Sequence, residues 1–271
     1  MTASSSQPSP FGRLLREWRA RRGMSQLRLA TEAGVSSRHL SFVETGRSQP
    51  SREMVLRLSE ALDVPLRERN ALLGAAGFAA VFRESSLGAP ELAPVERMLG
   101  FLLAQYEPFP AYLVDRCTRV LRANRAGLAT FAPFVNDAPV WRETPLNLMR
   151  LTLDPAGLRP AIVNWEEVAS ALLVRLAREA ALASADTELA ALVEELRAIP
   201  GLPDSVRVPD LTRPPPPILA VHLKGDGVDL RFFTMLTTLG TPQDVTLQDL
   251  HIESFMPADA ETESRLRTPA S

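Results

Sequence analysis

The chain has 271 residues, which is long enough for two ordinary domains or one large one. Its composition, 45% hydrophobic and 23% charged, is typical of a soluble globular protein, and no apolar run approaches the roughly 18 residues that span a membrane. The net charge of −2 hides an asymmetry: residues 1–84 carry 13 Arg against 8 acidic residues, whereas residues 85–271 carry 17 basic and 24 acidic residues. This split favours a polyanionic partner for the first part only.

The N-terminal residues 1–10 have neither a basic segment nor an apolar segment of the kind found in secretory signals. We expect them to form a disordered tail. The single cysteine, Cys117, excludes an internal disulfide and a cysteine-rich metal site, which fits a reducing cytoplasm. We interpret it as a small buried residue on a strand.

Helical periodicity dominates residues 11–82. A first helix is expected over residues 11–23. Each of the next three helices begins after a serine that can act as an N-cap: Ser25, Ser36 and Ser51. A fifth helix begins at Pro65, because proline is favoured in the first turn. Five short helices in this span predict a compact all-α domain.

Residues 83–90 have the composition of a linker, and the pattern changes after them. In residues 91–257 strand-like runs alternate with helical ones, which predicts an α/β domain. Two apolar runs around Gly225-Asp226-Gly227 predict a hairpin, and the prolines at 213–217 predict a rigid spacer. We expect residues 258–271 to be a disordered tail.

The stretch from Ala33 to Arg38 carries the strongest functional signal. A short helix, a tight turn at Gly34 and a second helix with a small, polar start are what a helix-turn-helix DNA reader needs. The major groove is about 12 Å wide, and arginine is the commonest side chain for bidentate recognition of guanine. Ser36 would cap the second helix and leave its positive dipole end near the phosphates.

The segment MSQLRLATEAGVSSRHLSFVETGRSQPS resembles the xenobiotic-response-element (XRE, Cro/repressor-like) helix-turn-helix family. The resemblance covers residues 12–75, in which spacing, turn and capping agree together. By position it implies that Gln26 and Arg47 bind phosphate and that Ser37 and Arg38 face base edges. It leaves open whether Phe42 touches a thymine methyl group or only packs. The implied DNA-binding residues are therefore Gln26, Ser36, Ser37, Arg38, Phe42 and Arg47.

Residues 91–257 resemble, more faintly, the MmyB-like ligand-binding domain of actinobacterial regulators. The stretches YEPFPAYLVDRCTRVLRANRAG, NWEEVASALLVRLAREA and FFTMLTTLGTPQDVTLQDLHIESFMPAD carry this resemblance. It implies a PAS-like α/β sensor: an antiparallel sheet, helices on one face and an apolar pocket for a small lipophilic ligand of the fatty-acid-like class. Candidate pocket residues are the large apolar side chains of this half: Phe131, Phe134, Trp141, Met149, Trp165, Phe232 and Met235.

Nothing in the sequence indicates an enzyme. His222 and His251 lie in strand-like runs, but neither has catalytic or metal-binding partners at a diagnostic spacing. We therefore expect no catalytic residue, no metal site and no cofactor.

These patterns together predict a cytoplasmic transcriptional regulator, most simply a repressor, that binds a pseudo-palindromic operator as a homodimer. A small apolar ligand would modulate its affinity for double-stranded DNA. The alternative is an adaptor whose helical domain docks a protein partner, with the C-terminal half as a dimerisation platform. An adaptor needs an apolar groove where this chain has Gln26, Arg38 and Arg47.

Overall fold

The computed structural model describes residues 9–135, 139–183, 187–207 and 218–268. It forms two compact units. The first consists of residues 1–85 together with residues 242–248, and the second contains the remainder of the chain. No described helix is long and apolar enough to cross a membrane.

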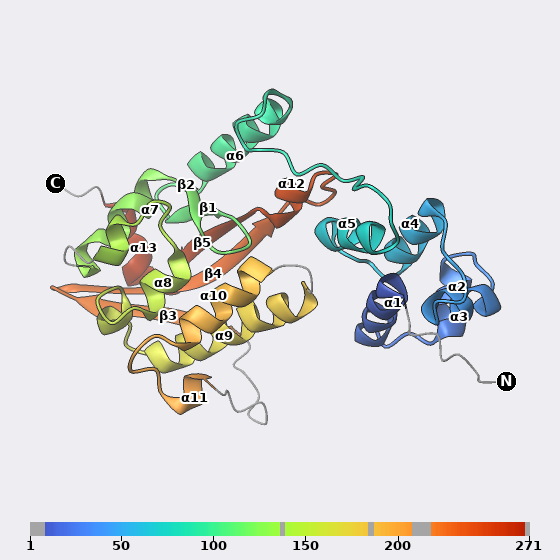
Figure 1. Cartoon of the computed structure of the whole chain (residues 1–271). Coiled ribbons are helices and arrows are strands. Elements are labelled where there is room, and N and C mark those ends of the chain that lie inside the picture. The colour runs from blue at the N-terminus through green and yellow to red at the C-terminus, as the bar shows by residue number, and fades with distance from the viewer. Residues whose placement is uncertain (1–8, 136–138, 184–186, 208–217, 269–271) are drawn as a thin grey trace. The chain divides into compact units, whose positions relative to one another are not determined.

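The helices of the first unit are those expected from the periodicity (Figure 1): α1 Pro10–Arg21, α2 Gln26–Glu32, α3 Ser37–Glu44, α4 Arg52–Ala61 and α5 Leu66–Ala75. The three predicted serine caps are confirmed. Ser25, Ser36 and Ser51 each accept a hydrogen bond from the backbone N–H three residues later, at 3.1–3.2 Å. Each hydroxyl thereby satisfies one backbone donor that the first helical turn leaves unpaired.

The start of α1 differs from the sequence-based expectation. Residues 1–10 were expected to be disordered, yet α1 begins at Pro10 and Ser9 accepts a hydrogen bond from Gly12 N–H. A serine followed by proline in the first turn is itself a helix-start signal. The rest of that predicted tail, residues 1–8, lies outside the described residues.

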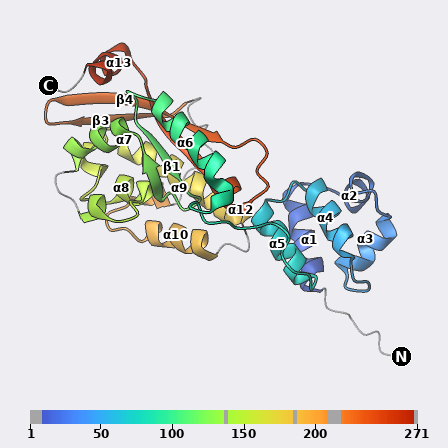
Figure 2. The ribbon, with the colours of Figure 1, turned by 90° about the horizontal axis from the view of Figure 1, so that it is seen from above.

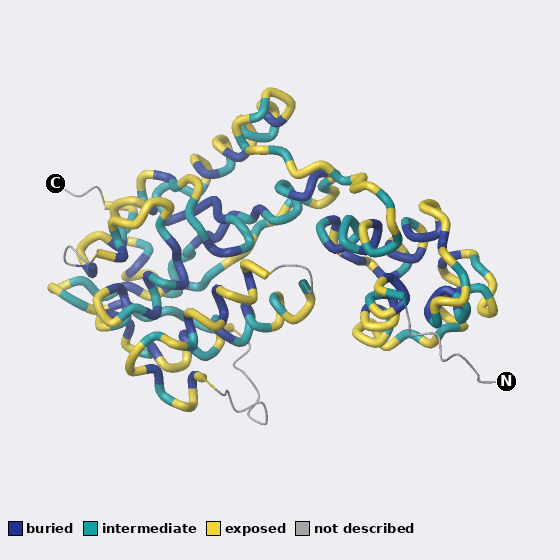
Figure 3. The backbone as a smooth tube through the Cα atoms, viewed as in Figure 1, coloured by how far each residue is buried: buried dark blue, intermediate teal, exposed yellow. Residues whose placement is uncertain are grey.

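One apolar cluster joins the five helices, and Figure 3 shows it as the buried stretches of the tube. Its largest members are fully buried: Phe11, Leu15, Trp18, Leu29, Leu40, Leu58, Leu62, Leu72 and Leu73. Gly34 and Gly46, with φ of +65° and +75°, end the two motif helices in a conformation that glycine adopts at no steric cost.

The second unit is built on a five-stranded antiparallel sheet in the order β2-β1-β5-β4-β3. Its strands are β1 Ala111–Val114, β2 Val120–Ala123, β3 Ala220–Gly225, β4 Val228–Thr238 and β5 His251–Pro257. The predicted hairpin joins β3 to β4: Asp226 and Gly227, with φ of +48° and +74°, form its turn. The predicted α/β class, an antiparallel sheet with helices, is confirmed.

The helices of the chain beyond the first five vary widely in length: α6 Ala93–Gln105, α7 Arg125–Thr130, α8 Leu148–Leu153, α9 Trp165–Leu182, α10 Thr187–Arg197, α11 Asp204–Arg207, α12 Val245–Asp249 and α13 Ala260–Arg267. Short 3₁₀ turns lie between some of them: Pro90–Leu92, Ala132–Phe134, Pro139–Arg142 and Arg159–Ala161. Asn124 caps α7 by accepting from Gly127 N–H.

Helices cover both faces of the sheet, whereas the PAS-like resemblance implied one face only. Thr234 of β4 and Val168 of α9 line the same cavity. Thr237, an odd number of residues further along β4, points to the opposite face. There its hydroxyl lies 2.9 Å from that of Tyr106, the residue that ends α6. Figures 1 and 2 show α6 and α9 on opposite sides of the strands.

Three expectations for this half are corrected or fall outside the described chain. Residues 258–271 were expected to be disordered, but Ala260–Arg267 form α13, capped by Asp259, which accepts from Thr262 N–H. Cys117 is buried, as expected, but it lies in the turn between β1 and β2 rather than on a strand. The proline run at 213–217 lies outside the described residues.

Candidate DNA interface and ligand pocket

The start of α3 is polar and open to solvent. Ser36, Ser37 and Arg38 are all exposed, and Ser36 N-caps the helix with its hydroxyl. Leu40 and Val43, further along the helix, are fully buried in the core of the first unit. The helix is thus anchored by its apolar side, and its N-terminal residues are free to meet a partner.

Phe42 lies one turn beyond Arg38 and packs against it. The Arg38 guanidinium lies 5.5 Å from the centre of the Phe42 ring, within the range of a cation–π contact. Phe42 is half-buried and packs against Arg38 in this structure. Contact with a thymine methyl group stays the second alternative. The ring also limits the positions that the arginine side chain can take.

A buried ionic cluster holds α1, α2 and α3 together. Glu44, at the end of α3, is fully buried, and its two carboxylate oxygens accept from Arg19 Nε at 2.7 Å and from Gln26 Nε2 at 2.7 Å. The hydrogen bond that Arg19 donates to Glu44 raises the pKa of Arg19, although partial burial acts in the opposite direction. Through Gln26 and Glu44 the cluster connects the two motif helices, α2 and α3.

This cluster changes the role available to Gln26. The resemblance implies that Gln26 holds a phosphate, yet one N–H of its amide already donates to Glu44. A primary amide has two N–H donors, so the second could still reach a phosphate oxygen. Arg47, in contrast, is exposed, and it follows the helix-ending Gly46. Its backbone N–H donates to Phe42 O at 2.8 Å, which fixes the chain direction at that point.

Helix α1 passes very close to the end of α3 at Gly12. A Cβ atom at Gly12 would lie 2.6 Å from the Glu44 carbonyl oxygen and 2.8 Å from that of Val43. Glycine is therefore required where α1 crosses the end of α3.

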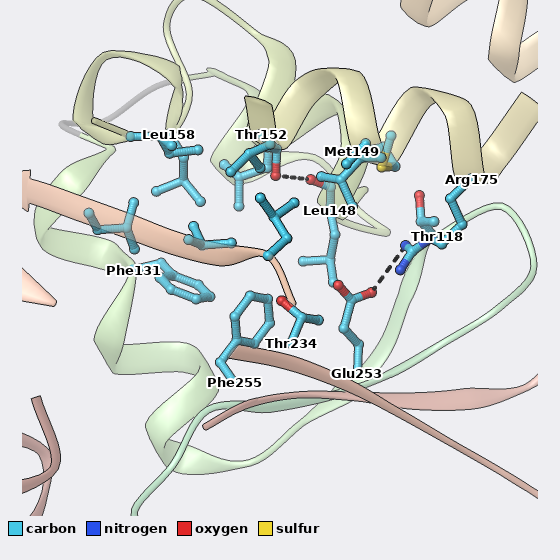
Figure 4. Close-up of a pocket in the computed structure, with 18 of the residues that line it drawn as sticks. Thr118, Phe131, Leu148, Met149, Thr152, Leu158, Arg175, Thr234, Glu253 and Phe255 are labelled. Atoms are coloured by element: carbon cyan, nitrogen blue, oxygen red, sulfur yellow. Dashed lines mark hydrogen bonds and ion pairs between the residues drawn. The ribbon is translucent and has the colours of Figure 1, made fainter. Parts of the chain in front are cut away.

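The second unit contains a largely apolar cavity of about 220 Å³ between the sheet and α8–α9 (Figure 4). Most of its lining is aliphatic or aromatic: Phe131, Leu148, Met149, Leu151, Leu158, Ile162, Val168, Ala171, Leu172, Ile218, Leu219, Val221, Leu223 and Phe255. Three threonines and two charged residues complete the wall: Thr118, Thr152, Thr234, Arg175 and Glu253. An apolar space with few polar groups is the usual form of a small-molecule site.

Two of the seven predicted pocket residues, Phe131 and Met149, line this cavity. Four others pack in the core around it instead: Phe134, Trp141, Trp165 and Phe232. Met235 is a correction, because it points away from the face of β4 that carries Thr234 and is 53% exposed.

Our sequence analysis did not identify the two charged lining residues. Arg175 lies on α9, and Glu253 lies on β5 with only 7% of its side chain exposed. Burial raises the pKa of Glu253, with a smaller contribution from nearby Glu179, whereas Arg175 acts in the opposite direction. A charged residue at an inward-facing strand position breaks the apolar alternation, and that break was the signal available in HIESFMP.

Comparison with known families matches both units. Residues 95–268 match the MmyB-like transcription regulator ligand binding domain, and residues 15–69 match a helix-turn-helix domain. The chain belongs to the MmyB-like transcription regulators. Both family resemblances identified in the sequence are thereby confirmed.

Two individual proteins are similar to part of this chain. The uncharacterized HTH-type transcriptional regulator RghRB of Bacillus subtilis (strain 168) is 37% identical over 84 residues, which are 31% of this chain and 58% of that protein. The chain thus matches less than two thirds of that relative. The restriction-modification controller protein C.AhdI from Aeromonas hydrophila is 38% identical in a match that covers 22% of this chain and 92% of the C.AhdI chain, with a TM-score of 0.22.

An MmyB-like regulator belongs to a family of transcription regulators and not to a family of enzymes. The two histidines considered as catalytic candidates, His222 and His251, lie on the strands β3 and β5. His222 Nε2 lies 2.7 Å from Asp229 Oδ1 across the β3–β4 hairpin. Burial and the nearby Arg175 lower the pKa of His251 to about 4, so this side chain is neutral at pH 7.

In this MmyB-like regulator, the connection between β4 and β5 belongs to the first unit. Residues 242–248, which lie between β4 and β5 along the chain, pack with the first unit. Gln248 Oε1 accepts from Leu66 N–H at 2.6 Å, at the start of α5, and Arg83 O accepts from Val245 N–H at 2.8 Å. The two strands that carry cavity residues Thr234 and Glu253 are thus joined through a segment of the DNA-binding unit.

Proposed function

We propose that this regulator is a repressor that reads DNA with α3 and responds to a small lipophilic ligand in its second unit. The observation that carries the DNA-binding part is the exposed, capped start of α3 held on a rigid support. Ser37 and Arg38 would contact base edges in the major groove, and Arg47 would bind a backbone phosphate. Ser36 and the N-terminal backbone of α3 would lie close to a phosphate.

The buried Glu44 cluster supports this proposal because a reading helix needs a fixed orientation. A protein that recognises base edges must place its side chains accurately, and supporting contacts behind the helix provide that accuracy. Gln26 would serve twice, supporting Glu44 and offering its second N–H to phosphate.

The experiment that tests DNA reading is selection of duplexes from a random library with the full chain, followed by sequencing. The proposal expects one enriched motif with two related halves, about one helical turn apart. Enrichment of no motif over the starting library would contradict it.

The cavity supports a lipophilic ligand, and fatty-acid-like chains are the starting class. Its walls come from α8, α9 and the sheet, and most of its lining side chains are apolar. Burial of an apolar chain contributes roughly 25 cal/mol per Å² removed from water, before the cost of association. Native mass spectrometry of the purified full chain tests this directly. We expect a bound species that organic extraction releases. If the protein carries none, added lipophilic molecules should raise its melting temperature. The absence of both effects would contradict a ligand-binding role for the cavity.

We further propose that the regulator binds its operator as a homodimer. One reading helix contacts too few base pairs to locate a single site in a genome, and two-fold symmetry doubles that number. Sedimentation of the free chain and of its complex with an enriched duplex tests this. Two chains for each duplex are expected, and one chain for each duplex would contradict the proposal.

A further inference from the structure

The polar end of the cavity is formed by Arg175 and Glu253, which are its two charged lining residues (Figure 4). The Glu253 side chain is 93% buried, and it extends from β5 toward the cavity and toward Arg175 of α9. Arg175 Nη2 lies 3.9 Å from Glu253 Oε2, which is too long for a hydrogen bond. Among the described residues, this carboxylate has the ion pair with Arg175 and no hydrogen-bond donor.

A buried carboxylate without a hydrogen-bond donor is costly, and native proteins rarely leave one unexplained. Similar polar side chains in the same wall are satisfied internally: Thr152 Oγ1 donates to Leu148 O at 2.8 Å, and Thr118 Oγ1 donates to Cys117 O at 2.6 Å. Glu253 is different because no described residue donates to it, so a molecule in the cavity or solvent can supply the donor.

The spacing of the pair is suited to a small polar group. An oxygen atom about 2.8 Å from both Oε2 and Nη2 can bridge partners that are about 4 Å apart without moving either. Such an atom must donate to the carboxylate and accept from the guanidinium. A hydroxyl oxygen does both, and a primary amide can do both with two atoms, its N–H donating and its carbonyl oxygen accepting. An ether or a carboxylate cannot donate, and an ammonium group cannot accept.

Charge argues in the same direction. An anionic head would approach Arg175 but would also lie beside Glu253, with Glu179 of α9 close enough to act on the same carboxylate. A cationic head would pair with Glu253 but would face Arg175. A neutral head avoids both repulsions.

Resting on the ligand-binding function proposed above, we infer that the cavity takes a lipophilic molecule with a neutral head that both donates and accepts, such as an alcohol or a primary amide. The head bridges Glu253 and Arg175, and the apolar body lies against Phe131, Met149 and Phe255. The ligand thus differs from a simple fatty-acid anion in its head and not in its chain.

Four probes with one alkyl chain test this inference on the full-length protein: 1-octanol, methyl octyl ether, octanoate and octylamine. Dissociation constants are measured by calorimetry at pH 7. Because a hydrogen bond to a charged group contributes about 1.5–3 kcal/mol, 1-octanol should bind at least about tenfold more tightly than the ether. It should also bind more tightly than octanoate and octylamine. Equal binding of 1-octanol and the ether, or tightest binding of octanoate, overturns the inference.

Substitutions at Glu253 test whether this residue causes the preference for 1-octanol over the ether. Glu253→Leu should remove the advantage of 1-octanol over the ether, whereas the control Thr152→Val, in the same wall, should keep it. If Glu253→Leu does not fold, Glu253→Gln serves: it removes the negative charge, so octanoate should gain affinity relative to wild type. An unchanged preference in the folded Glu253 variant overturns the inference.

These outcomes separate the inference from the proposed function. If all four probes bind equally well, the cavity is a lipophilic site and only the role of Glu253 is wrong. If no probe binds wild-type protein, the ligand-binding function of the cavity is contradicted as well.

Discussion

Arg38 and Arg47 are both exposed on the first unit; Arg38 lies in the first turn of α3, and Arg47 lies three residues beyond its last residue, Glu44. We expect Arg38→Ala to cost about 1–3 kcal/mol on the preferred duplex and to relax the preference at one base pair in each half-site. Arg47→Ala should weaken binding to all duplexes similarly and lower the salt dependence, because it removes a phosphate contact. Fluorescence anisotropy on matched and single-substitution duplexes measures both effects.

The control for this pair is Arg57→Ala on α4, where the side chain is exposed and pairs with Glu53 at 2.6 Å. An exposed pair within one helix contributes little, so DNA affinity should hardly change. Equal losses on every duplex from Arg38→Ala would remove Arg38 from base reading.

His251 predicts a pH effect on stability. In the folded chain its pKa is lowered to about 4, whereas the unfolded value is near 6.5. The unfolded state therefore binds more protons between these values, and the contribution of His251 to stability is lost as pH falls from about 6.5 to about 4. Urea unfolding of wild type and His251→Gln at several pH values measures it. The free-energy difference between the two proteins should be constant above pH 7 and should shift against wild type below it. A pH-independent difference would contradict this.

For single residues, the sequence predicted interactions between residues that are close together along the chain. Serine caps act within four residues of the chain, so Ser25, Ser36 and Ser51 could be assigned from the pattern. The Glu44 cluster could not be predicted in the same way. Its partner Arg19 is 25 residues away, and only the packing of the helices brings the two together.

Among the elements, the crossing of α1 over the end of α3 depends on one glycine. We expect Gly12→Ala to destabilise the first unit by about 1–3 kcal/mol, because its Cβ would lie within 2.8 Å of two backbone oxygens that cannot rotate away. DNA affinity should fall with stability, since the crossing also positions α3. Thermal unfolding measures the effect.

Gly74→Ala is the matched control within the same unit. A Cβ atom at this position in α5 would meet no heavy atom within 4 Å. Alanine is favoured over glycine in a helix by about 0.5–1 kcal/mol, so this variant should be slightly more stable than wild type. A Gly12→Ala protein as stable as Gly74→Ala would show that the helices can move apart freely.

The elements of the second unit were predicted better than the directions of their side chains. The hairpin followed from its turn residues, and the strand-like run that contains His251 forms β5. Whether an apolar residue lines a cavity or fills the core depends on packing between elements. Phe131 and Phe232 touch each other edge to face, yet only Phe131 reaches the cavity.

At the scale of the whole chain, residues 242–248 offer a covalent route between the two functions. A ligand that changes β4 and β5 would act on the segment that accepts a hydrogen bond from Leu66 N–H through Gln248. Coupling requires that the ligand bind two arrangements of the chain with different affinities. We expect Gln248→Ala to reduce the change in operator affinity caused by saturating 1-octanol, without abolishing DNA binding.

Gln243→Ala is the control for this prediction, because Gln243 is exposed in the same segment. The readout is the ratio of operator dissociation constants with and without 1-octanol, for which a coupling of about 1–3 kcal/mol corresponds to about 5- to 150-fold. If Gln248→Ala and Gln243→Ala change the ratio of operator dissociation constants equally, the coupling does not depend on the Gln248 hydrogen bond, and the prediction is wrong.

The claim that α3 reads a specific duplex is tested most directly by one titration. The full chain is titrated onto the duplex enriched by selection and onto a scrambled duplex of the same composition, at one stated salt concentration. We predict that the enriched duplex binds at least about a thousandfold more tightly. Equal affinity for the two duplexes would contradict the account.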